Sequence, residues 1–158
     1  MTVLPRKFAS EGAIDRIAFG LLDGSLPKEE WTHEAHLAAC LWIITRRRDI
    51  DPEKDLREII GRYNVAVGGV NDDQGGYHDT ITRCFVLGVR HWLARTEAKT
   101  LLDRVNGLLE ADEGQRDWPL RFYSRARLFS VEARRGFVEP DKAHFGYGIS
   151  RKFVSDGA

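Results

Sequence analysis

The chain has 158 residues, enough to bury one hydrophobic core without disulfides or metal ions. Hydrophobic residues make up 42% and charged residues 30%, a composition that excludes a disordered or membrane-embedded chain. Because 24 basic residues balance 24 acidic ones, the charge does not support a nucleic-acid or anionic-membrane partner. We therefore expect a single domain over residues 1–158, with a core at about 10–140 and a loose C-terminal tail over 141–158.

The start of the chain lacks the apolar segment of a secretion signal, and no stretch reaches membrane-spanning length. The two cysteines, Cys40 and Cys84, show no CxxC spacing, and we interpret both as reduced thiols. These features predict a cytoplasmic protein. They leave its oligomeric state open.

Apolar residues recur at steps of three and four residues, which predicts a series of helices. The first runs over about 10–23 and begins at Ser10, a good N-cap. The second follows Thr32 and ends near the arginines at 46–48, whose charge suits the C-terminal end of a helix. The third begins at 51–52, an Asp-Pro pair, and ends at the glycines at 68–69.

Three further helices are predicted over about 77–94, 97–110 and 124–135. No segment of strand length alternates apolar and polar residues, and no internal repeat is present. The sequence therefore predicts an all-α fold, an up-down bundle of about five to six helices.

Three histidines stand near predicted helix starts. His33 and His36 share one helix face with apolar residues, and His78 begins the apolar stripe of the fourth helix. Because short connections favour antiparallel neighbours, the helix between them should return the chain to its starting end. We therefore expect His33, His36 and His78 to meet at one end of the bundle.

Three neutral imidazoles can bind a divalent transition metal (Zn, Ni, Fe or Mn) and leave a position for water or substrate. A metal-bound water would make these histidines catalytic, with hydrolysis as the default reaction and a small molecule, which could be anionic, as substrate. The alternatives are a metal-free polar or catalytic pocket, a binding module for a metal or small ligand, and an interaction domain with structural histidines.

Several polar residues should lie at the level of the histidines, where the third helix ends and the fourth begins. Their hydroxyl, amide and guanidinium groups could bind a substrate, although capping and packing are the simpler roles. The candidates for substrate binding are Tyr63, Asn64, Tyr77, Thr82 and Arg125.

Segments 31–37 (WTHEAHL) and 76–82 (GYHDTIT) resemble the two signatures of a small family of uncharacterised bacterial proteins. The resemblance extends to 62–64, 123–125 and 139–141, and implies a shared site without indicating its chemistry. A weaker similarity, carried by the pair His78 and Asp79, is to the HD-domain phosphohydrolases, which are helical and bind metal. The predicted site also resembles that of the DinB-like metal-binding helix bundles in its number of histidine ligands, which is three.

Overall fold

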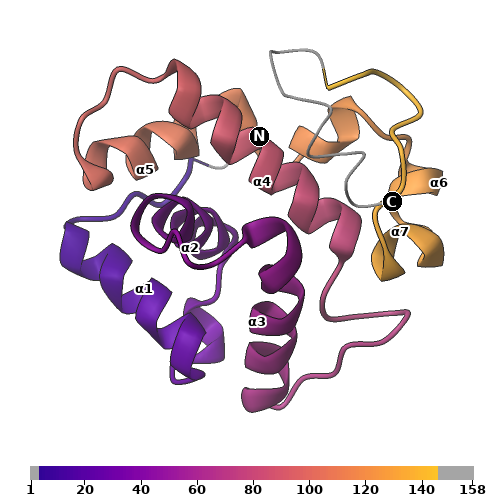
Figure 1. Ribbon diagram of the computed structural model, residues 1–158, viewed down its shortest axis with the longest axis horizontal. Coiled ribbons are helices and arrows are strands. Elements are labelled where there is room, and N and C mark those ends of the chain that lie inside the picture. Colours follow the sequence, from indigo (N-terminus) through magenta and orange to yellow (C-terminus); the bar gives the residue numbers. More distant parts are fainter. Residues whose placement is uncertain (1–3, 146–158) are drawn as a thin grey trace.

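The computed structural model describes residues 4–145, and its regular elements are all helical, which confirms the all-α prediction (Figure 1). The five longer helices are α1 (Glu11–Asp23), α2 (His33–Arg46), α3 (Pro52–Ala66), α4 (Asp79–Arg95) and α5 (Leu101–Glu110). Two short helices follow, α6 (Arg125–Leu128) and α7 (Val131–Arg135). Short 3₁₀ turns lie between some of these helices. The turn η1 (Lys28–Glu30) precedes α2, and η2 (Asp112–Gly114) and η3 (Trp118–Arg121) lie between α5 and α6.

Helix α2 lies at the centre of the fold and packs against α1, α3, α4 and α5. Figure 1 shows it nearly end-on, with these four helices arranged around it. Its sequence explains this position, because eight of its residues, from Ala35 to Ile43, are buried and apolar. A helix that is apolar on most sides can only be stable when other helices cover it.

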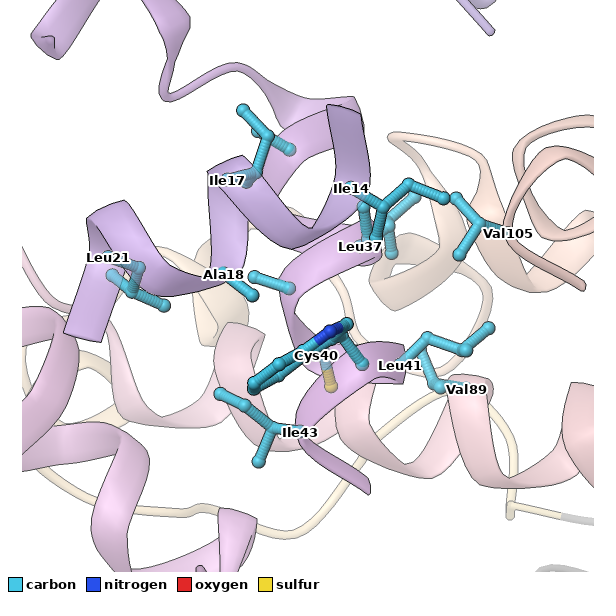
Figure 2. Close-up of a cluster of buried hydrophobic side chains, with 14 of the residues drawn as sticks. Ile14, Ile17, Ala18, Leu21, Leu37, Cys40, Leu41, Ile43, Val89 and Val105 are labelled. Atoms are coloured by element: carbon cyan, nitrogen blue, oxygen red, sulfur yellow. The ribbon is translucent and has the colours of Figure 1, made fainter. Parts of the chain in front are cut away.

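The main hydrophobic core fills the space between α2 and its neighbours (Figure 2). Its members include Ile14 and Leu21 of α1, Leu37 and Leu41 of α2, Val89 of α4 and Val105 of α5. A second core lies between α4 and the C-terminal segments and centres on Trp118 and Tyr123. Both cysteines are free thiols and buried, as the sequence analysis expects.

Side-chain caps fix most helix starts. The hydroxyl groups of Ser10, Thr32 and Thr100 each accept a hydrogen bond from the backbone three residues further on. The cap at Thr100 places the start of α5 at Leu101, later than the predicted start at 97. Likewise, α4 begins at Asp79, because residue 78 is its N-cap and has an extended backbone.

The single helix predicted over 124–135 is two helices in the structure. The backbone leaves the helical path at Phe129, and the Ser130 hydroxyl accepts a hydrogen bond from the Ala133 N–H to begin α7. Serine competes for backbone hydrogen bonds in this way and so favours helix starts over helix interiors. The break lets α7 fold back beside α4, with α6 packed against α7.

The predicted C-terminal tail, 141–158, is described only as far as residue 145. Within that part, the Asp141 carboxylate accepts hydrogen bonds from Ser124, and the side chain of Phe145 is buried against the second core. Residues 146–158 lie outside the described part of the chain. Over residues 4–145, no helix is long and apolar enough to cross a lipid bilayer.

Candidate functional site

A cavity of about 310 Å³ lies beside the first turns of α2 and α4. It is lined by residues of α1 to α4, by Trp31, which follows η1, and by Arg116, which follows η2. Most of its walls are apolar, and its polar lining residues include His33, His36, Thr82 and Arg116. The apolar lining comprises Leu21, Trp31, Leu37, Ala39, Cys40, Leu56, Ile60, Ile81, Phe85 and Val86. We call it the histidine cavity.

His36 lies on the cavity wall with its ring held on two sides. Its Nδ1 donates a hydrogen bond of 2.7 Å to the carbonyl oxygen of Thr32, one turn earlier in the chain. The ring stacks on Trp31, with 3.7 Å between ring centroids and 28° between planes. A carbonyl oxygen only accepts, so Nδ1 carries the proton and Nε2 keeps its lone pair. This Nε2 has no hydrogen-bond partner within residues 4–145.

The charge state of His36 follows from its surroundings. His36 is exposed to solvent, and the protein packed around its ring lowers the pKa of His36 to about 4 by desolvation, with a further contribution from His33. His36 is therefore a neutral hydrogen-bond acceptor at neutral pH.

His33 is fixed by a contact that is distant in sequence. Its Nε2 donates a hydrogen bond of 2.8 Å to the carbonyl oxygen of Gly114 in η2. The ring meets Phe85 of α4 edge-on, with 5.5 Å between centroids. Partial burial lowers the pKa of His33, and the nearby Arg116 adds to this effect. His33 is thus also neutral, and its Nδ1 has no hydrogen-bond partner within the described residues.

The turn that accepts this bond is itself anchored by a buried carboxylate. Glu113 is only 1% exposed, and its oxygens accept two hydrogen bonds from Arg95, of 2.7 and 2.8 Å. His91 contacts the same carboxylate at 2.6 Å. Although burial opposes ionisation, these bonds hold the pKa of Glu113 at about 2. The charged Glu113 therefore ties η2, and with it Gly114, to α4.

His78 does not face the histidine cavity with the other two histidines. Its Nε2 donates a hydrogen bond of 2.8 Å to the carbonyl oxygen of Leu128, and its Nδ1 accepts one from the Ile81 N–H at 3.2 Å. Both ring nitrogens are therefore used inside the protein. Burial lowers the pKa of His78, which keeps the ring neutral. Its position is that of an N-cap that also attaches α6 to α4.

Of the three histidines predicted to meet, His33 and His36 line the histidine cavity and His78 does not. Over residues 4–145, no group of three or more His, Cys, Asp or Glu side chains is placed to hold one metal ion. The physical reason lies at residue 78: as an N-cap with φ −130° it stands outside the helix, so its side chain does not follow the helix face. A three-histidine centre for Zn, Ni, Fe or Mn does not fit this arrangement, because His78 has no free nitrogen.

Of the predicted substrate-binding residues, Thr82 lines the histidine cavity. Tyr63 is buried, and its hydroxyl donates to the carbonyl oxygen of Leu26 at 2.8 Å. Its ring also meets Trp31 edge-on, so it supports the cavity wall from behind. Arg125 is exposed at the start of α6 and does not line this cavity.

Asn64 and Tyr77 belong to a different region, around the loop between α3 and α4. The Asn64 amide donates to Asn71 at 2.9 Å, and the Tyr77 hydroxyl donates to the buried carboxylate of Asp79 at 2.8 Å. Tyr77 also lines a second cleft of about 290 Å³, where Arg57 and Arg135 are ion-paired with aspartates. These contacts stabilise the loop, and the side-chain contact between Tyr77 and Thr82 links it to the edge of the histidine cavity.

Sequence reasoning missed Arg116 and Gly114, which both contribute to the site. Arg116 lines the cavity, and its guanidinium lies 4.0 Å from the Glu34 carboxylate. No local sequence pattern indicates either residue, because each contacts α2 from a turn that lies about 80 residues further along the chain.

Fold and site together define an all-helical protein with a mainly apolar cavity and two neutral imidazoles on its wall. No family model matches the chain, and no curated protein and no solved structure matches it either. The resemblances carried by segments 31–37 and 76–82 therefore stay predictions. The function has to be inferred from the cavity itself.

Proposed function

We propose that this protein binds a small, largely apolar organic molecule in the histidine cavity. The observation that carries the proposal is the combination of a cavity of about 310 Å³ with two imidazoles that each keep one nitrogen without a partner in residues 4–145. Small-molecule sites have volumes of roughly 300–1,000 Å³, with apolar walls and a few polar groups that orient the ligand. The histidine cavity has these properties at the lower end of the size range.

The rigidity of the two histidines supports binding in a defined orientation. His36 is held by the backbone of its own helix and by Trp31, whereas His33 is held by Gly114. Neither ring has to be reoriented when a ligand enters, so the entropic cost of binding is reduced. His78, by contrast, uses both of its ring nitrogens inside the protein.

The donor set favours an organic ligand over a divalent transition metal. A three-histidine centre would require His78 to give up its hydrogen bonds to Leu128 and Ile81. Two neutral imidazoles suit the polar group of an organic molecule without further protein ligands. The alternative of metal-dependent hydrolysis is tested by metal analysis, as described in the Discussion.

The proposal is tested by screening small aromatic and aliphatic compounds by ligand-observed NMR. Thr82→Phe places a ring in the cavity and should abolish binding of the compounds found. Ala126→Phe adds the same ring to an exposed position of α6 and should leave binding unchanged. Circular dichroism and a cooperative unfolding transition confirm that both variants fold. Absence of any binder, or equal binding to both variants, would contradict the proposal.

A further inference from the structure

We propose that the ligand is a phenol-type compound whose hydroxyl group donates a hydrogen bond to Nε2 of His36. This inference rests on the proposed binding function and specifies the ligand class. Its starting point is the hydrogen bond from Nδ1 of His36 to the Thr32 carbonyl, which leaves Nε2 as an acceptor only. A ligand that meets Nε2 must therefore bring the proton, as a hydroxyl group does.

The position of this acceptor favours an aromatic ligand. The His36 ring is stacked on Trp31, and His33 is packed edge-on against Phe85, and both aromatic rings line the histidine cavity together with the two histidines. The lining continues towards Cys40 and Leu56 without a charged group. Aromatic rings bind well to such walls through burial of apolar area and through ring contacts. A phenol therefore places its ring against the apolar lining and its hydroxyl against His36.

The charges near the cavity argue against an anionic ligand. The one cationic side chain that lines it, among the described residues, is Arg116, which lies near the carboxylate of Glu34. The Arg116 side chain is 74% exposed, so water screens its attraction for an anion. The lone pairs of two neutral imidazoles repel a carboxylate. A neutral hydroxyl compound avoids that repulsion.

Three probes of matching shape separate these possibilities: 4-propylphenol, 4-propylanisole and 4-propylbenzoate. The phenol has a donor, the anisole has only an acceptor, and the benzoate carries a negative charge. Binding is measured by isothermal titration calorimetry on the full chain at neutral pH. We expect the phenol to bind roughly threefold to tenfold more tightly than the anisole, the effect of one neutral hydrogen bond. Hydrophobicity alone would favour the anisole, so this order is diagnostic.

The variant His36→Phe keeps an aromatic ring beside Trp31 but removes the acceptor. In this variant the ratio of the phenol affinity to the anisole affinity should fall to about one or below, because the acceptor that favours the phenol is gone. His144→Phe, an exposed position outside the cavity lining, is the matched control and should keep the wild-type order.

The outcomes distinguish this inference from the proposed function. If phenol and anisole bind equally, or if the preference persists in His36→Phe, the hydroxyl assignment is wrong while the cavity still binds ligands. If the benzoate binds most tightly, the site captures anions through Arg116 and the assignment is wrong. If neither these probes nor any compound of the wider screen binds, the proposed function itself fails.

Discussion

The Nε2 atom of His33 and the carbonyl oxygen of Gly114 are joined by a hydrogen bond of 2.8 Å across 81 residues of sequence. This bond ties the first turn of α2 to η2. Because the buried Glu113 holds η2 against α4, the bond also sets the distance between two walls of the histidine cavity. It makes His33 a structural part of the site as well as a cavity-lining residue.

Replacing His33 by alanine should lower the free energy of unfolding by about 1–2 kcal/mol. The Gly114 carbonyl would lose its donor in a partly buried place, and the edge contact with Phe85 would disappear. Urea denaturation followed by circular dichroism measures the change. Lys99→Ala, at an exposed position, serves as the reference and should stay within about 0.5 kcal/mol of wild type. Equal stability of the two variants would show that the bond contributes nothing.

Replacing His78 by alanine should cost about 2 kcal/mol, because two hydrogen bonds are lost. One caps α4 at the Ile81 N–H, and the other attaches Leu128 of α6. His78→Asn can restore the cap but cannot reach Leu128, so about half of the loss should be recovered. Thermal and urea unfolding of both variants check this order. If asparagine gives no recovery, the capping role assigned to His78 is incorrect.

Acid should begin to destabilise the fold below pH 6.5, above the range in which most carboxylates titrate. The pKa values of His33, His36 and His78 are all lowered in the folded protein from the ordinary 6.5, that of His36 to about 4. Between pH 6.5 and about 4 the unfolded chain therefore binds more protons than the folded chain. The contribution of these neutral histidines to the free energy of unfolding should be fully present above pH 6.5. It should decrease as the pH drops through this window.

His78 should contribute visibly to that pH dependence. The charged groups that act on its ring are Arg134, which disfavours protonation, and Asp79, which favours it; burial outweighs both. In His78→Asn, urea unfolding measured at successive pH values should show a shallower decline below pH 6.5 than the wild type. An unchanged slope would mean that His78 is not kept neutral by folding.

Metal analysis tests the three-histidine centre predicted from the sequence. Protein purified without a His-tag should contain far less than one equivalent of Zn, Ni, Fe or Mn, because both nitrogens of His78 are engaged. Added zinc should raise the melting temperature of wild type and of His78→Ala by the same small amount. One bound equivalent that disappears in His78→Ala would reinstate the metal centre and the hydrolytic function.

The sequence predicts the longer helices well because their signals are local. Ser10, Thr32 and the Asp51-Pro52 pair mark helix starts by direct contacts with the next turn. The late start of α5 and the break between α6 and α7 are set by Thr100 and Ser130, whose caps compete with an apolar pattern that continues across them. Periodicity alone therefore places the start of α5 too early and misses the start of α7.

The candidate site could be predicted only in part. His33 and His36 lie three residues apart inside one helix, so a shared face follows from helix geometry. The same argument fails for His78, whose extended backbone at the N-cap sends its ring towards Leu128. Gly114 and Arg116 come from a turn whose position depends on the buried Glu113, a tertiary contact without a local pattern.

Binding of a ligand to His36 in the histidine cavity can be followed directly at the ring nitrogens of this histidine. Long-range ¹H–¹⁵N NMR resolves the side-chain nitrogens of the histidines during a titration with 4-propylphenol. The Nε2 resonance of His36 should move as its lone pair accepts the hydroxyl proton, with a smaller shift at His33, while His78 and His144 stay in place. Saturation of the protein with an unchanged His36 signal, or no change at any histidine, would contradict the account.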